Sequence, residues 1–149
     1  MPAPRSSASN RLPQAGVDPI CSAGDALAVF ALQLSQPLCH ETLVMLIDSS
    51  GCGLSLITVS DTTLPHQVVD VADTMAIMLA DRPDVSGMVL ATVRPRGGVL
   101  ADDDTLWFEA DAVVESQELV LYDWLVIGRG GTRSVVEELG VPSRWPSRT

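Results

Sequence analysis

Two arginines in a short glycine-rich segment are the side chains best suited to bind an anion. Residues 94–98 read Arg-Pro-Arg-Gly-Gly and follow an apolar run, so we expect them at the carboxyl end of a strand, where ligand sites of open α/β sheets collect. Arg94 and Arg96 could hold a carboxylate or a phosphate by bidentate hydrogen bonds. The three aspartates at residues 102–104 would repel that anion. We therefore expect structural ion pairs in this segment, with anion recognition as the alternative.

Other arrangements that could support catalysis are weak in this chain. Cys39 and His40 are neighbours, but consecutive residues of a strand point to opposite faces, so we expect no Cys–His pair. The aspartates at 102–104 lack the spaced ligands of a calcium loop, and we expect them to cap a helix and complement the positive end of its dipole. The glycines within 128–131 predict a tight turn rather than a phosphate loop. The absence of lysine excludes Schiff-base chemistry.

The composition predicts one acidic globular domain that uses no metal and no cofactor. The 149 residues are 46% hydrophobic and 19% charged. Nine arginines against 19 acidic residues give a formal charge of -10, which disfavours binding to nucleic acid. Cys21, Cys39 and Cys52 are expected to be small buried thiols, and the two histidines show no zinc-ligand spacing with them. Because no apolar run reaches the roughly 18 residues that cross a bilayer, and no secretory stretch opens the chain, we expect a cytoplasmic protein without membrane contact.

The hydrophobic pattern predicts an α/β fold, with a mixed β-sheet flanked by helices. Residues 1–18, rich in Pro, Ser and Ala, are expected to be a disordered arm, residues 19–141 the domain and residues 142–149 a tail. The expected elements are a helix at 23–35, a hairpin of strands at 42–47 and 54–59, a helix at 65–80, a central strand at 88–93, a helix at 102–118, a strand at 119–127 and a short element at 134–138.

Trp107 and Phe108 are adjacent aromatic residues on the predicted helix at 102–118. Neighbouring helical positions lie about 100° apart, so both rings cannot point into the centre of one narrow apolar stripe. At least one ring is therefore expected at the edge of the stripe. It would lie against the rim of the sheet or contact a partner, including a second copy in a homodimer, since aromatic residues are enriched at interfaces.

The order of these segments resembles the RadC-like branch of the JAB/MPN fold, the fold of the JAMM zinc isopeptidases. The resemblance rests on TLVMLIDSSGCGLSLITVS, GMVLATVRPRGG and LYDWLVIGRGGTRSVVEELG, with a helix between successive pieces. In that branch the central strand runs into an HNHPSG motif, which Pro95 and Gly97 match in part. The strand of the type LLDHIIIG is matched by residues 121–128. The resemblance covers about residues 39–140 and implies a JAB/MPN, or cytidine deaminase-like, architecture in a bacterial protein.

The departures from the family pattern fall on its metal ligands. Thr92 and Arg94 stand where the two zinc-binding histidines are expected, and Thr105 stands where the third ligand, an aspartate, is expected. Glu41 matches the general base of the family. Because arginine has no lone pair for a metal and its charge repels a cation, the resemblance implies the fold without the metallopeptidase chemistry. We expect Glu41 to pair with Arg94 instead.

The sequence therefore predicts a catalytically inactive JAB/MPN domain, a pseudoenzyme that binds another protein or a peptide. An alternative is a metal-dependent hydrolase or isopeptidase with a relocated site that uses Glu41, His40 or the aspartates at 102–104. A third interpretation, an accessory factor of mobile-element or DNA-repair systems, follows from the family association alone.

Overall fold

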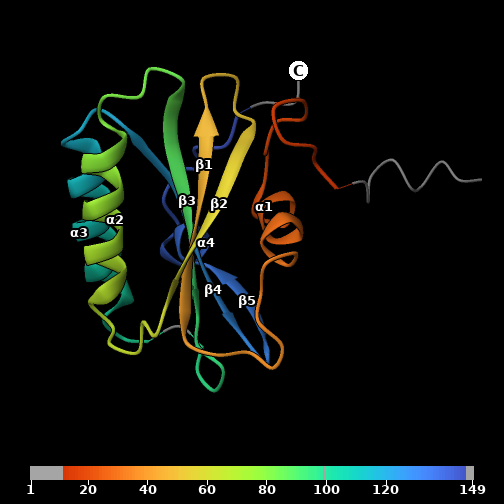
Figure 1. The fold of residues 1–149 in the computed structure, drawn as a ribbon. Helices are drawn as coiled ribbons and strands as arrows, with labels where there is room; N and C mark the ends of the chain where they lie inside the picture. The colour runs from red at the N-terminus through yellow and green to blue at the C-terminus, as the bar shows by residue number, and fades with distance from the viewer. Residues whose placement is uncertain (1–11, 99, 147–149) are drawn as a thin grey trace, which may run out of the picture.

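A five-stranded mixed β-sheet lies between helices on its two faces (Figure 1). The structure is a computed structural model that describes residues 12–98 and 100–146. Its elements are α1 (Ala23–Phe30), β1 (Glu41–Asp48), β2 (Gly53–Ser60), α2 (Gln67–Leu79), β3 (Val85–Val93), α3 (Asp103–Glu115), β4 (Val120–Gly128), β5 (Gly131–Ser134) and α4 (Val135–Leu139). The predicted α/β class, a mixed sheet flanked by helices, is confirmed.

The sheet has the strand order β2-β1-β3-β4-β5. β1 is antiparallel to both β2 and β3, β3 is parallel to β4, and β4 is antiparallel to β5. The predicted hairpin is the β1–β2 pair, whose short connection imposes the antiparallel arrangement. The predicted central strand is β3, in which every residue except Ser86 is buried. An all-apolar run with a helix layer on each side explains this burial.

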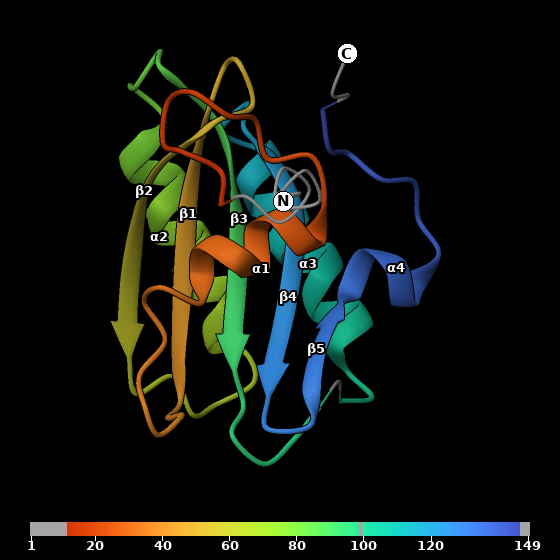
Figure 2. The ribbon, with the colours of Figure 1, turned by 90° about the vertical axis from the view of Figure 1, so that its right-hand side faces the viewer.

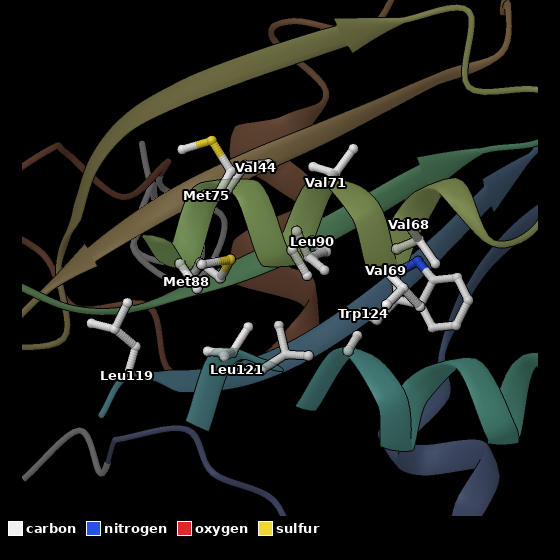
Figure 3. Packing of buried hydrophobic residues seen from close by; sticks show 14 of the residues in the cluster. Val44, Val68, Val69, Val71, Met75, Met88, Leu90, Leu119, Leu121 and Trp124 are labelled. Carbon is white, nitrogen blue, oxygen red and sulfur yellow. The ribbon is translucent and has the colours of Figure 1, made fainter. Parts of the chain in front are cut away.

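Alternating residues of the strands form two separate cores. Val44 and Leu46 of β1 face α2 and α3, whereas Leu43, Met45 and Ile47 face α1. The two helices α2 and α3 lie side by side on one face, and the shorter α1 covers the other (Figures 1 and 2). Figure 3 shows the larger core, in which apolar residues of α2 and α3 pack on the sheet. This alternation decides on which face each polar side chain of a strand will lie.

Three elements differ from the sequence expectation. The first helix ends at Phe30 rather than at residue 35, because Phe30 is buried while Leu32 beyond it is exposed and gains nothing from continued helix. α3 ends at Glu115, three residues early, and Glu118 adopts a positive φ of 60° in the turn that follows. The strand β5 was not expected, since its four residues carry no apolar alternation and are held by pairing with β4.

The segments that flank the predicted domain pack on it wherever the structure describes them. Residues 1–11 of the expected arm lie outside the described residues, but Gly16 donates its N–H to the Gly53 carbonyl at 3.0 Å. In the expected tail, Trp145 stacks on Tyr122 with ring centroids 6.0 Å apart, and residues 147–149 lie outside the described residues. No helix in the described part of the chain has the length and apolar character needed to cross a membrane.

Candidate functional site

Thr92 and Arg94 lie at the carboxyl end of β3, on the face covered by α2 and α3. Thr92 accepts a hydrogen bond from Nε1 of the buried Trp124 at 2.8 Å. The backbone N–H of Arg94 donates to the Ile127 carbonyl at 2.8 Å and so continues the pairing with β4 past the end of the strand. Both side chains are buried. Thr92 and Arg94, two of the three residues that the resemblance would place at metal-ligand positions, therefore lie close together.

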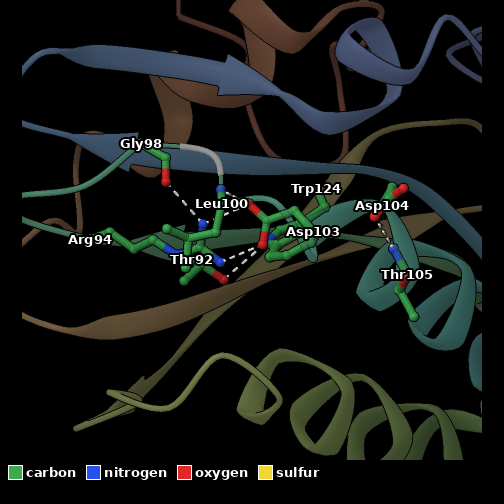
Figure 4. Close-up of polar contacts among 8 residues, drawn as sticks. All are labelled: Thr92, Arg94, Gly98, Leu100, Asp103, Asp104, Thr105 and Trp124. Carbon is green, nitrogen blue, oxygen red and sulfur yellow. Dashed lines mark hydrogen bonds and ion pairs between the residues drawn. The ribbon is translucent and has the colours of Figure 1, made fainter.

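The Arg94 guanidinium forms a bidentate ion pair with Asp103 in the first turn of α3 (Figure 4). Its two terminal nitrogens lie 2.7 and 2.8 Å from the carboxylate oxygens, and Nη1 also donates to the Gly98 carbonyl at 3.0 Å. Leu100 donates its backbone N–H to Asp103 at 2.6 Å. The guanidinium lies 5.6 Å from the centroid of the Trp124 ring, a cation–π distance. The predicted structural ion pairing is therefore confirmed for Arg94, whereas Arg96 forms no ion pair with a described acidic residue.

Glu41 does not pair with Arg94, so that expectation is wrong. Its carboxylate is buried on the other face of the sheet and accepts from the Ser35 backbone N–H at 3.1 Å and from Ser35 Oγ at 2.9 Å. The ladder pairs Glu41 with Val93, whose side chain belongs to the core under α1. Because successive residues of a strand alternate between faces, Arg94 points to the opposite side. The carboxylate instead anchors the loop between α1 and β1.

Thr105 lies outside this cluster. Thr105 and Asp104 are exposed, and Asp104 accepts only the N–H of the next residue, at 2.8 Å. Figure 4 shows both apart from the Arg94–Asp103 pair. Asp103 was expected only to complement the helix dipole together with its two neighbouring aspartates, but it is the buried member of the three. Its place three residues before Leu106 and seven before Ala110, both buried, is the signal that could have identified it.

Pro95 and Gly97 shape the loop at residues 94–98, which packs on the end of β4. Gly97 donates its N–H to the Arg94 carbonyl at 3.2 Å, closing a turn. A Cβ at Gly128 would lie 2.6 Å from the Gly97 carbonyl oxygen, so only glycine allows this approach. Arg96, between the two turn residues, is exposed. Pro95 and Gly97 therefore lie in a turn between β3 and α3.

Two hollows flank this loop. The first, here called the β3-end pocket, has a volume of about 200 Å³. Its wall includes Thr42, Thr62, Leu64, Val68, Thr92 and Leu100, with His40, Arg94 and Arg96 also at its surface. The second, here called the β5 cleft, has a volume of about 670 Å³ and is lined by residues that include Arg96, Gly98, Gly130, Arg133, Glu137 and Glu138. Arg96 and Gly97 border both hollows.

Potential metal ligands are dispersed in the described part of the chain, which holds no group of three or more His, Cys, Asp or Glu side chains that could bind one ion. All three thiols are free. Only Cys52 is fully buried, and its burial raises the pKa of the thiol. Cys21 is half-buried and Cys39 is exposed, so the expectation of buried thiols is wrong for these two.

The two aromatic residues of α3 have different surroundings, as the helix geometry predicts. Trp107 is fully buried, with the Arg144 guanidinium 5.4 Å from its ring centroid. Phe108 is 56% exposed. The candidate interface on this helix is therefore reduced to Phe108.

No protein-family model matches the chain, and no curated protein does. The resemblance to JAB/MPN domains rests on the residues and the order of elements described above.

Proposed function

We propose that this chain is a metal-free JAB/MPN-like domain, a pseudoenzyme that binds another protein or a peptide and does not hydrolyse peptide or isopeptide bonds. The observation that carries the proposal is the buried ion pair of Arg94 and Asp103. It stands where the family resemblance would place a metal ion. The assignment to the RadC-like branch is part of the proposal.

The chemistry of this ion pair opposes metal binding at the same place. Arg94 has no lone pair, and its fixed positive charge repels a cation. Both carboxylate oxygens of Asp103 already accept hydrogen bonds from the guanidinium. Thr92 Oγ1 already accepts a hydrogen bond from Trp124. A metal ion there would have to displace a buried guanidinium and leave Asp103 without its partner, which is costly in a low-dielectric site.

The position of the candidate base is a second argument against hydrolysis. A metal-bound water needs a carboxylate within hydrogen-bond reach to take its proton. Glu41 lies on the opposite face of the sheet from Arg94, with both carboxylate oxygens bound to Ser35. The family base and the family metal position are therefore separated by the sheet itself.

Binding to a polypeptide fits the surface better than binding to nucleic acid. The chain has a formal charge of -10, which repels a phosphate backbone. Exposed apolar side chains such as Leu64, Leu100 and Phe108 offer contacts to a protein partner or to a second copy. We also propose a cytoplasmic location, which the three free thiols support.

Zinc titration tests the proposal. We expect the purified chain to bind no zinc at micromolar concentration and to cleave no peptide with zinc present. The variant Thr92→His with Arg94→His would supply two imidazoles beside Asp103 and is expected to gain zinc affinity. Arg82→His, at an exposed site remote from the pocket, serves as the matched control. Stoichiometric zinc in the unmodified protein, or zinc-dependent cleavage by it, would overturn the proposal.

A further inference from the structure

Arg96 stands out among the arginines that the structure describes. Four of those arginines pair with a carboxylate: Arg82 with Asp84, Arg94 with Asp103, Arg133 with Glu138 and Arg144 with Asp111. Arg96 and Arg129 have no ion pair with a described acidic residue. Acidic residues outnumber arginines in the chain by 19 to nine, so a lack of acids does not explain this. Of these two, Arg96 lines both the β3-end pocket and the β5 cleft. Its guanidinium is available to a carboxylate from outside.

The β3-end pocket suits one apolar side chain. Its volume of about 200 Å³ is comparable to cavities of roughly 150 Å³ that accept benzene. Leu64 and Leu100 line it and remain 66% and 45% exposed, so they leave apolar surface in water at this place. Arg94 also lines this pocket, and its guanidinium is held in place by the ion pair with Asp103. An aliphatic side chain placed here would cover exposed leucine surface.

The β5 cleft suits an extended main chain. Gly98 and Gly130 line it, and a Cβ at either position would meet no atom within 4 Å. Neither glycine has a positive φ, so neither packing nor backbone conformation of the free protein requires glycine here. Glycine also allows a ligand to approach the backbone closely, which would account for the glycines at these two positions. The neighbouring edge strand β5 is paired on one side only, with β4.

We propose that this surface binds the free carboxyl terminus of a polypeptide. The terminal carboxylate lies on Arg96, the last side chain, which is aliphatic, enters the β3-end pocket, and the preceding residues lie along the β5 cleft. Arginine binds a carboxylate through two parallel hydrogen bonds, which gives the site its selectivity for a free terminus. This inference rests on the proposed polypeptide-binding function and specifies the partner's chemistry.

The charges around the two hollows restrict the bound segment further. Glu138 is neutralised by Arg133, whereas Glu137 forms no ion pair with a described residue. Glu137 therefore disfavours acidic residues upstream of the terminus and favours basic ones. Glu137 also opposes the binding of a polyphosphate chain in this cleft. His40 lines the β3-end pocket, on the side of the terminal residue.

The first part of the test is selection of peptides with free carboxyl termini. The full chain is immobilised and presented with random eight-residue peptides displayed at the carboxyl end of a carrier protein. We expect enrichment of Val, Leu or Ile at the last position and depletion of Asp and Glu before it. The most enriched sequence is then synthesised twice, with a free carboxylate and with a carboxamide, and binding is measured by fluorescence polarisation.

We expect the carboxamide to bind at least about tenfold more weakly than the free acid, and Arg96→Gln to lose a similar factor for the free acid only. Gly98→Leu places a side chain in the β5 cleft and should weaken the binding of both the free-acid and the carboxamide peptide. Arg82→Gln, the exposed control, should leave binding within twofold of the unmodified protein. Circular dichroism and thermal unfolding check that each variant folds.

Three outcomes would overturn this inference. If the acid and the carboxamide bind equally, or if Arg96→Gln has no effect, the site does not recognise a carboxyl terminus, although peptide binding as a function stands. If no peptide is enriched, this surface is not a site for carboxyl termini. The zinc titration of the proposed function is independent of both results.

Discussion

Arg94 at the end of β3 and Asp103 in the first turn of α3 form a buried bidentate ion pair that joins a strand to the helix following it. Arg94 is 8% exposed and Asp103 is 1% exposed. The Gly98 carbonyl and the Leu100 N–H hydrogen-bond the same two side chains, so the pair also holds the intervening loop. The pair therefore positions the loop that borders both hollows.

Removal of one partner of this pair should destabilise the protein strongly. Arg94→Met or Asp103→Asn leaves a buried charge without its partner, and we expect each to lower the free energy of unfolding by about 3–5 kcal/mol. The double variant should cost less than the sum, because no unpaired charge remains. Urea unfolding of the four proteins measures the coupling. The exposed pair of Arg82 and Asp84 is the control and should show little coupling, and additive effects at Arg94 and Asp103 would contradict the prediction.

Glu41 should be coupled to Ser35 and not to Arg94. Glu41→Gln removes the negative charge that accepts two hydrogen bonds from Ser35, and we expect a loss of about 1–3 kcal/mol in the free energy of unfolding. Combined with Ser35→Ala, the loss should be less than additive. Combined with Arg94→Met it should be additive, because the sheet separates the two side chains. Coupling between Glu41 and Arg94 in this cycle would contradict the assignment of faces.

Asp123 should make the protein less stable as the pH rises. Burial raises the pKa of this carboxyl, although hydrogen bonds from Ser134 Oγ and the Trp124 N–H, each at 2.7 Å, partly oppose the shift. Because its folded pKa lies above the unfolded value, the folded state binds more protons between the two, and stability falls as pH increases from about 4 through the folded pKa. The stability of Asp123→Asn relative to the unmodified protein should therefore increase as the pH rises from about 4 through the folded pKa of Asp123.

The control for Asp123 is Asp84, an acid whose pKa is shifted in the opposite direction. The hydrogen bond from Arg82 lowers the pKa of Asp84, so its contribution is present at neutral pH and is lost as the pH falls through the folded pKa. Because this ion pair is exposed to solvent, urea unfolding of Asp84→Asn should show only a small stability difference, of opposite pH dependence. Parallel curves for the two variants would contradict the prediction for Asp123.

Substitutions at the two aromatic residues of α3 should affect different properties: Trp107 the free energy of unfolding, and Phe108 any self-association. Trp107→Ala removes a fully buried ring, and we expect a loss of about 3–5 kcal/mol in the free energy of unfolding. Phe108→Ser changes a ring that is mostly in solvent and should leave that free energy nearly unchanged. If the protein forms a homodimer through this helix, light scattering should show that Phe108→Ser shifts it towards the monomer. A dimer that is indifferent to Phe108→Ser would place the contact elsewhere.

Local pattern was enough to predict most of the elements. The continuous apolar run of β3 identified a strand buried on both faces, and the spacing of Val68, Ala72 and Met75 identified α2. These signals are local because each element must bury its own apolar face, whatever its neighbours are. β5 escaped detection because four residues with two exposed polar side chains carry no such signal, and pairing with β4 decides their conformation.

The contacts of the candidate site were decided by tertiary structure. The sequence predicted Glu41 as the acidic partner of Arg94, and it predicted the aspartates at 102–104 only as residues that cap a helix and complement its dipole. The choice depended on ladder register, which pairs Glu41 with Val93 and so turns it away from Arg94. It also depended on the rotation of α3, which points Asp103 inward and leaves Asp104 in solvent. A shift of one residue in the β1 ladder would exchange the faces of that strand, and a shift of one residue in α3 would rotate its side chains by about 100°. Only the packing of the whole sheet and its helices excludes these shifts.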